Sequence, residues 1–247
     1  MENKNEIMEI CLLAGKIMLE SGAETYRVED TMNRMAAAFG NVTSHSYVTP
    51  TAIMFSTSET EPSNLIRINE RSTDLEKVTL VNGISRKISS GELTLPDAKR
   101  ELDALSKKNL SYPIWIQIFS AAIASGCFTI MFLGTWVDFI PSCITGGVGF
   151  SIFVFLHRLV RIKFFAEIMA SFVIGVVAYL FIVTGVGAEL DKIIIGSVMP
   201  LVPGLLITNA IRDLIAGHLV SGISKGAEAF LTALAIGTGI AVVLAIL

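Results

Sequence analysis

The sequence has little of what disulfide-rich domains, zinc proteins and common enzymes depend on. Its three cysteines, Cys11, Cys127 and Cys143, form no CxxC pair and have no histidine cluster beside them. This spacing indicates neither a disulfide framework nor a zinc site. There is also no nucleophile elbow, P-loop, dinucleotide-binding glycine motif or Ser/His/Asp spacing. We therefore expect a protein that is not an enzyme and that uses no metal or cofactor.

Charge is scarce in the second part of the chain. Residues 1–110 contain 13 of the 19 Lys and Arg and 16 of the 22 Asp and Glu, which leaves six of each sign for the other 137 residues. The step near residues 107–109 predicts a soluble domain over 1–110 and a membrane domain over 111–247, as expected for a chain that is 52% hydrophobic. A net charge of −3 does not favour nucleic acid as a partner.

The N-terminus lacks the basic segment of a secretory signal, and the first long apolar run begins only after residue 110. We expect no cleavage, so the N-terminal domain should remain on the side of the membrane where it is made.

The N-terminal domain is predicted to be α+β, in the order α-α-β-β-β-α-α. Apolar periodicity predicts helices over about 5–20 and 24–39, with Gly22 as a left-handed cap after the first. Short β-branched and aromatic runs over 42–48, 52–57 and 65–69, with a turn over 58–63, predict three antiparallel strands. Helical spacing then returns behind Thr73 and Glu76 at capping-box separation, and again from Thr94. Asn82-Gly83 is interpreted as an irregularity in the first of these helices.

Five uncharged intervals predict five transmembrane helices, over about 113–133, 138–157, 165–185, 192–211 and 228–247. Each has about 18 residues or more, enough to cross a hydrocarbon core of about 30 Å. Glycines in the second, third and fifth helices are expected to allow close helix packing.

Lys and Arg alternate between the connections, which predicts a cytoplasmic N-terminal domain and an external C-terminus. The basic connections contain Lys107 and Lys108, then Arg158, Arg161 and Lys163, then Arg212 and Lys225.

The fourth predicted span is interrupted by Pro200, Pro203 and Gly204. Two prolines remove backbone donors at a depth where lipid offers no water, so such a break must face protein or a polar cavity. Transporters use interrupted helices to present backbone groups to a substrate. A simple proline kink between packed helices is the alternative.

Polar residues flank these helices and crowd one helix start in the N-terminal domain. Glu167, Asp213 and Glu228 lie near predicted helix ends, where they could be interfacial or could handle substrate or protons, with Glu167 and Glu228 as the proton-coupling candidates. Glu24, Thr25, Tyr26, Arg27 and Glu29 form either a solvated helix N-terminus or a polar cluster facing the membrane domain or a partner. The histidines His45, His157 and His218 are expected at the surface or the interface.

The combined motifs resemble the bacterial threonine/serine exporter family over nearly the whole chain. They are residues 21–29, Pro203-Gly204, Asn209-Ala210-x-Arg212-Asp213, Gly217-x-x-x-Ser221-Gly222 and Glu228-Ala229. Within that family the chain is similar to the larger subunit of the split form, including the subunit implicated in succinate export. Lys225 departs from the arginine of many relatives, which puts a direct ligand role there in doubt.

The resemblance implies a secondary exporter of threonine, serine or succinate-like dicarboxylates in the bacterial inner membrane, working with a separate small multi-pass membrane subunit. An odd set of five helices with one broken helix also resembles half of a two-repeat transporter. Asn209 would hydrogen-bond the substrate or the partner helix, and Arg212 would offer a cation for the carboxylate. Arg212 could instead pair with Asp213 or anchor at the cytoplasmic interface. The alternative is a regulatory or assembly subunit whose N-terminal domain gates a partner channel. The solute, the coupling ion and the number of copies in a higher oligomer stay open.

Overall fold

The protein divides into two compact, mostly helical units. The computed structural model describes residues 2–40, 43–58, 62–160, 162 and 164–246. The first unit comprises Met1–Ser111 and Leu206–Gly226, and the second comprises Tyr112–Leu205 and Ala227–Leu247. Residue 42 of the first predicted strand, 59–61 of the predicted turn, and Arg161 and Lys163 of the basic connections lie outside the described residues.

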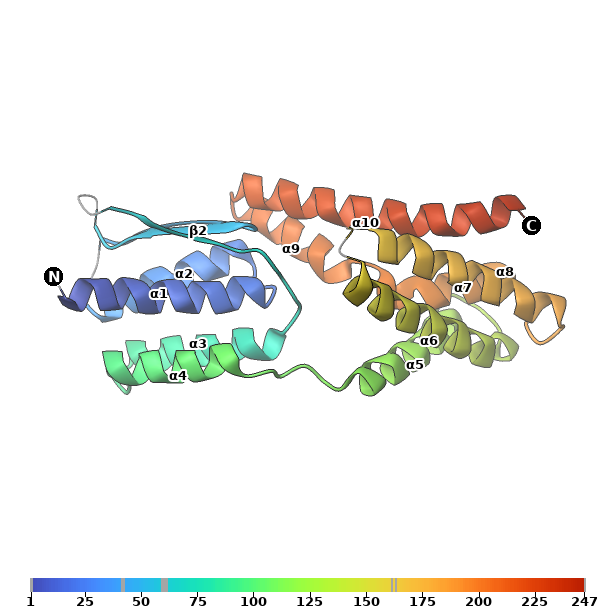
Figure 1. Cartoon of the computed structure of the whole chain (residues 1–247), viewed down its shortest axis with the longest axis horizontal. Helices are drawn as coiled ribbons and strands as arrows, with labels where there is room; N and C mark the ends of the chain where they lie inside the picture. The colour runs from blue at the N-terminus through green and yellow to red at the C-terminus, as the bar shows by residue number, and fades with distance from the viewer. Residues whose placement is uncertain (1, 41–42, 59–61, 161, 163, 247) are drawn as a thin grey trace. The chain divides into compact units, whose positions relative to one another are not determined.

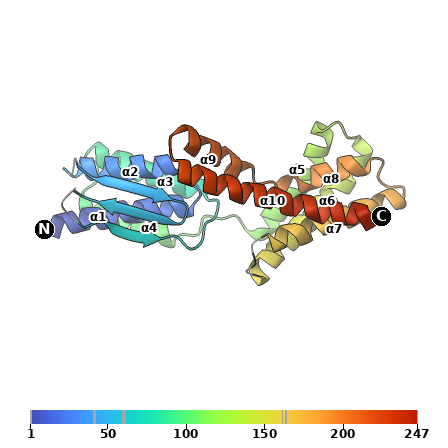
Figure 2. The ribbon, with the colours of Figure 1, turned by 90° about the horizontal axis from the view of Figure 1, so that it is seen from above.

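The N-terminal part of the first unit, which we call the head, has three layers (Figures 1 and 2). A sheet of β1, β2 and β3 covers the pair α1 and α2, and α3 and α4 lie on the other side of that pair. Both strand pairings are antiparallel, in the order β1-β2-β3. The element order agrees with the prediction. The bounds are α1 Glu2–Glu20, α2 Thr25–Ala38, β1 His45–Thr49, β2 Ala52–Ser56, β3 Asn64–Arg67, α3 Leu75–Ser89 and α4 Leu95–Lys107.

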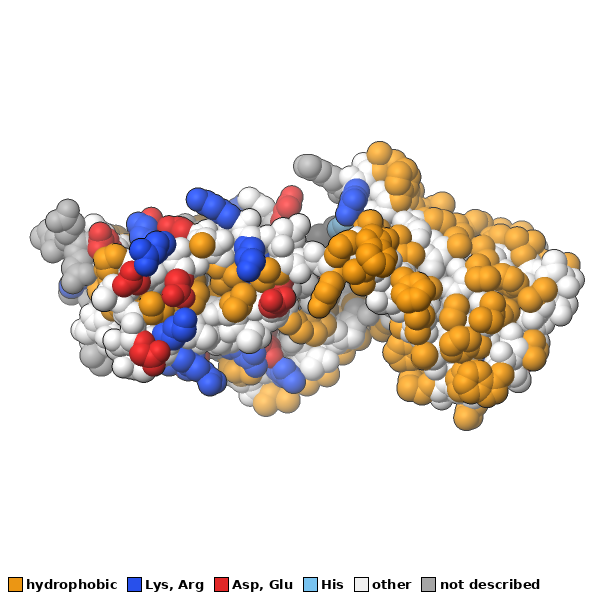
Figure 3. Space-filling model, turned by 90° about the horizontal axis from the view of Figure 1, so that it is seen from below, with side chains coloured by type: hydrophobic (Ala, Val, Ile, Leu, Met, Phe, Trp, Pro, Cys, Tyr) orange, Lys and Arg blue, Asp and Glu red, His pale blue; other side chains and the backbone are white. Residues whose placement is uncertain are grey.

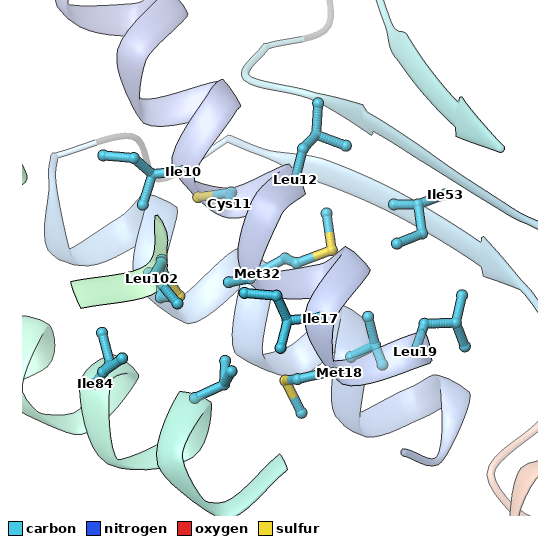
Figure 4. Packing of buried hydrophobic residues seen from close by; sticks show 14 of the residues in the cluster. Ile10, Cys11, Leu12, Ile17, Met18, Leu19, Met32, Ile53, Ile84 and Leu102 are labelled. Atoms are coloured by element: carbon cyan, nitrogen blue, oxygen red, sulfur yellow. The ribbon is translucent and has the colours of Figure 1, made fainter. Parts of the chain in front are cut away.

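The head core lies around the buried faces of α1 and α2. Met18 and Met32 are fully buried there with Ile53 of β2 and Leu102 of α4 (Figure 4). Unbranched methionine side chains fill the irregular space where helices meet a sheet. The head therefore has a continuous core of its own.

Helix ends in the head agree only partly with the sequence signals. Gly22 follows α1 with φ +87°, which confirms the left-handed cap. The capping box at Thr73 and Glu76 is wrong by one position, because Asp74 is the N-cap and accepts from Lys77 N at 3.1 Å. The irregularity expected at Asn82-Gly83 is also absent, since α3 runs through both residues without a break.

The second unit contains the apolar helices. Among the described residues, four helices are long and apolar enough to cross a membrane, or five if an interrupted pair counts as one span. The four are α5 Ile114–Met131, α6 Trp136–Leu159, α7 Phe165–Val183 and α10 Leu219–Ile246. The pair consists of α8 Leu190–Val198, continued by the 3₁₀ turn η1 Met199–Leu201, and of α9 Gly204–Ile215, most of which belongs to the first unit.

The second unit is apolar outside and carries small and hydroxyl residues inside. Hydrophobic side chains cover much of its visible face, whereas charged side chains are scattered over the head (Figure 3). Inside, Thr129 of α5 donates to Ser142 Oγ of α6 at 2.7 Å, and Ser197 of α8 donates to Ser142 O at 3.3 Å. Such a surface suits lipid, and hydroxyl pairs between close backbones hold helices together where the hydrophobic effect cannot.

Asp138 joins two ends of the second unit. Its fully buried carboxylate accepts from Thr135 Oγ1 at 2.6 Å and from the backbone N–H groups of Ala188 and Glu189 at 2.7 and 3.2 Å. It therefore links the first turn of α6 to backbone N–H groups at the start of α8 that have no partner inside α8.

The glycines predicted to allow close packing divide into two groups. A Cβ at Gly146 or Gly239 would collide with Ser125 or Ser171, whereas a Cβ at Gly237 would meet nothing within 4 Å. Gly196 of α8, which the sequence did not single out, is also tightly constrained. Its Cβ would lie 2.8 Å from Ser125 O and 2.9 Å from Thr129 N, both backbone atoms of α5.

Gly196→Ala should therefore destabilise the protein, because backbone atoms cannot rotate away from the added methyl group. Overpacking of this kind costs about 1–3 kcal/mol. The melting temperature of the detergent-purified protein should fall, while the matched control Gly237→Ala should keep or raise it. Equal melting temperatures for the two variants would contradict this account of the α5–α8 contact.

Candidate functional site

The predicted break lies between α8 and α9. Pro200 lies in the first turn of η1, where a backbone N–H group would have no partner inside the helix, and Pro203 precedes Gly204, the first residue of α9. Val202 N donates to Met199 O at 3.2 Å and Gly204 N donates to Val202 O at 2.8 Å. These short turns replace the regular helical hydrogen bonds that the prolines remove.

Beyond the break, α9 and α10 form a tight hairpin. The turn passes through Gly217 with φ +87°, and His218 N donates to Asp213 O at 2.8 Å. Gly222 of α10 lies so close to α9 that a Cβ would be 2.9 Å from Ala210 O. The close approach brings the polar faces of the two helices together.

Asp213 is the centre of the candidate site. Its carboxylate is fully buried and accepts from Thr25 N at 3.0 Å, from Thr25 Oγ1 at 2.9 Å and from Lys225 Nζ at 2.7 Å. Thr25 is the first residue of α2, and its N-cap, Glu24, makes no capping bond with its own side chain. A carboxylate 188 positions away therefore caps α2 and interacts favourably with its dipole.

Glu24 is a second buried carboxylate, shared between two arginines. Arg212 Nη1 donates to Glu24 Oε1 at 2.6 Å, and Arg27 Nε lies 3.2 Å from Glu24 Oε2. The Arg212 side chain is 54% exposed and the Glu24 side chain only 7%. Arg212 can thus offer further donors outward while one N–H group holds Glu24. The pairing of Arg212 with Asp213 that the sequence left open is not the one observed.

Three more contacts join the 209–221 segment to the head. Asn209 Nδ2 donates to Gly22 O at 3.0 Å, Ser221 Oγ donates to Val48 O at 3.1 Å, and His218 Nδ1 lies 3.6 Å from Glu29 Oε1. Two signature stretches about 190 residues apart, 21–29 and 209–222, therefore meet in one hydrogen-bonded cluster.

The Glu29 carboxyl group of this cluster has a raised pKa. Burial raises its pKa above the ordinary value of 4.5, and the nearby Asp213 carboxylate adds to the rise. The Val48 N–H group, which donates to Glu29 Oε1 at 2.7 Å, and His218 oppose the rise without cancelling it.

The other predicted site residues lie elsewhere. Glu167 is in the first turn of α7, where its Oε2 is buried and has no hydrogen-bond partner among the described residues. Glu228 is half-buried within α10, on its second-unit part. Tyr26 is half-buried beside the cluster, and no described hydrogen bond joins it to Asp213 or Glu24.

Sequence reasoning undervalued Lys225, Ser221 and His218. Lys225 was doubted as a ligand because it replaces arginine, yet its ammonium is 4% exposed and pairs with Asp213. The available signal was spacing, because Ser221 and Lys225 are four residues apart and so share one face of α10. What that face contacts could not be predicted from one helix.

The Asp213–Lys225 pair generates a stability prediction. Lys225→Met should lower stability by about 3–5 kcal/mol, because it leaves a buried carboxylate without its counter-charge. The double variant Asp213→Asn/Lys225→Met should lose less than the single one. Lys99→Met is the matched control, since Lys99 also lies 2.8 Å from a carboxylate, that of Glu9, but both side chains are exposed. Thermal unfolding in detergent measures all three, and an equal drop for Lys99→Met and Lys225→Met would contradict the role of burial.

Glu29 generates a pH prediction. Because its pKa is raised on folding, the stabilising contribution of its protonated form is present below pH 4.5 and is lost as the pH rises through the folded-state value. Glu29→Gln keeps the acceptor for Val48 N–H and removes the titration. The melting temperature of the wild type should fall relative to that of Glu29→Gln as the pH rises from 4.5 towards neutrality. Glu70→Gln, at an exposed position, should follow the wild type; a constant difference between wild type and Glu29→Gln across this range would show that Glu29 does not titrate as inferred.

Comparison with known proteins gives this cluster its context. A family model described as "Putative threonine/serine exporter" matches residues 9–247. The chain is 24% identical to "Probable threonine/serine exporter" of Mycobacterium tuberculosis over 92% of its own length, and spans 44% of that protein's length.

Two further relatives match nearly end to end. "Probable succinate transporter subunit YjjP" of Klebsiella aerogenes is 27% identical over 95% of this chain and 91% of the relative. The protein of the same name from Escherichia coli is 24% identical over 99% and 96%. No solved structure matches the chain. With a family model covering all but its first eight residues and with four or five apolar spans, the chain belongs to the threonine/serine exporter family of membrane transport proteins.

Proposed function

We propose that this chain is one subunit of a secondary exporter of small carboxylate-bearing metabolites, such as threonine, serine or succinate. Its partner is a separate small multi-pass membrane subunit of the same family. The head faces the cytoplasm and the C-terminus lies outside the cell. Two relatives of nearly the same length are named as transporter subunits, and a relative more than twice as long is named as an exporter by itself. This difference in length supports a shared exporter whose second part is a separate chain.

One observation carries the proposal: Arg212 already binds a carboxylate, that of Glu24, through a 2.6 Å hydrogen bond while half of its side chain is exposed. A guanidinium ion presents several donors in one plane and suits carboxylates. A substrate carboxylate arriving at Arg212 competes with Glu24 or adds to it. Substrate binding is then linked to the contact that Arg212 makes with the head.

The membrane-domain elements have complementary roles in this proposal. The five apolar segments form the transmembrane part, and the break at Pro200, Pro203 and Gly204 supplies backbone groups for the path. Asn209 and Asp213 hold the position of Arg212 through Gly22 and Thr25. Glu167 and Glu228 are the carboxylates that carry a coupled proton. Transport follows alternating access, in which the two facing states differ in their affinity for the substrate.

The Arg212–Glu24 pair allows a transport role to be separated from a structural one. Arg212→Gln and Glu24→Gln each remove one charge from the same pair, so a merely structural pair predicts similar losses of stability and of transport. We expect instead that Arg212→Gln reduces export at least about tenfold, the loss of one charge-assisted hydrogen bond. Glu24→Gln should retain most of the export, because it leaves Arg212 available to the substrate.

The measurement is efflux of radiolabelled threonine, serine and succinate from liposomes that contain this chain with its co-encoded membrane neighbour. Melting temperatures of the same preparations control for folding. Export that survives both Arg212→Gln and Arg212→Ala/Asn209→Ala would remove these residues from the substrate path.

A further inference from the structure

A polar groove lies between α2 and α3 on the head, and the cluster around Asp213 does not account for it. Its cavity volume is about 760 Å³, within the range of small-molecule sites. Six of the residues that line it are Tyr26, Arg27, Arg34, Asn82, Gly83 and Arg86. The lining residues that belong to α3 recur at helical spacing, so they form one stripe along the helix.

The groove has an excess of positive charge. Three arginines line it, and the only lining carboxylate is that of Asp30. Arg34 Nη2 lies 3.3 Å from Asp30 Oδ2, and Arg27 pairs with Glu24 at its edge. No ion pair with Arg86 occurs among the described residues, although its side chain is exposed at the groove. The lining side chains therefore carry more positive than negative charge, which favours an anion.

The guanidinium group of Arg34 also bears on which ligand the groove can bind. Its Nε is buried and donates to no acceptor in the described part of the chain. A buried N–H group without an acceptor is costly. Arg34 Nη2 already contacts Asp30 Oδ2 at 3.3 Å and Thr31 Oγ1 at 3.4 Å, so a bound anion would share this guanidinium with them.

Gly83 is difficult to explain by stability. It lies in the interior of α3, where glycine costs about 1 kcal/mol relative to alanine. Its φ is not among the positive values, and a Cβ placed on it would meet nothing within 4 Å. Neither backbone conformation nor close packing requires glycine here. Because Gly83 lines the groove, its missing side chain leaves room for a ligand.

We infer that this groove binds a small, multiply charged anion bearing carboxylate or phosphate groups, and that the bound anion adjusts transport through Arg27. Arg27 lines the groove and pairs with Glu24, and Glu24 pairs with Arg212 of α9. An anion that takes up Arg27 leaves the Glu24 carboxylate to Arg212 alone. The Arg212–Glu24 contact is thereby strengthened, and Arg212 is less available to a substrate. This second step rests on the proposed function, whereas the binding step does not.

Binding is tested by isothermal titration of the full chain in detergent with citrate and with pyrophosphate, at constant ionic strength in a buffer free of both. We expect at least one of them to bind, and the stronger of the two identifies carboxylate or phosphate as the ligand chemistry. Arg86→Gln and Gly83→Leu should each weaken binding at least tenfold, the first by removing charge and the second by filling the groove. Arg100→Gln, which removes an arginine that is 80% exposed on α4, should bind as the wild type does.

Several results would overturn the site. They are no binding of either anion by the wild type at millimolar concentration, unchanged affinity in both Arg86→Gln and Gly83→Leu, and an equal loss in Arg100→Gln. Because Arg86 is exposed, Arg86→Gln remains informative even where Gly83→Leu fails to fold.

The regulatory step is tested in liposomes by adding the better-binding anion on the head side. Export should fall severalfold in the wild type and stay constant in Arg86→Gln. If the bound anion left the export rate of the wild type unchanged, the link through Arg27 would be overturned. Binding by a protein that exports none of the three solutes would support the groove and count against the proposed function instead.

Discussion

The structure of the first unit depends on one buried carboxylate. Asp213 comes from a largely apolar part of the chain and is fully removed from solvent, so its charge must be compensated locally. Lys225 supplies the counter-charge from the next helix, and Thr25 supplies two donors at the start of α2. If the α9–α10 hairpin and the head separated, Asp213 would lose both Thr25 donors. A buried polar group would then be left without its partner in an apolar environment. Leu206–Gly226 is thereby made part of the first unit together with the head.

The buried polar groups of the second unit also need partners, and they find them in contacts between its apolar helices. In lipid the hydrophobic effect does not bring helices together, so polar groups and close contacts must do so. Asp138 satisfies donors at two helix starts, and the hydroxyls of Thr129 and Ser142 pair between α5 and α6. Each of these groups is buried. The interior of this unit is therefore held together by specific polar contacts, and apolar side chains cover its outside.

In the proposed exporter, Arg212 and Arg27 connect the head to the substrate path, because both contact the Glu24 carboxylate. Glu24 is nearly buried and can be shared in different proportions between the two guanidinium groups. A ligand that binds one of the two arginines changes how strongly Glu24 interacts with the other arginine, and such coupling is reciprocal. In this proposal the head has a function beyond assembly, and the exporter and regulatory alternatives posed by the sequence do not exclude one another.

The sequence by itself determined the helices, their order, the three strands and the apolar segments, since these depend on periodicity, local caps and composition. Gly22 is an example, because a left-handed residue after a helix is a local requirement. Only the tertiary structure decided that Asp213 caps α2, that Lys225 rather than Arg212 neutralises it, and that Arg212 turns to Glu24. A carboxylate can accept from any donor brought within reach, and nothing in the local sequence states which donor 188 residues away will be there. The sequence therefore identified the important polar residues, but only the tertiary structure identified their partners.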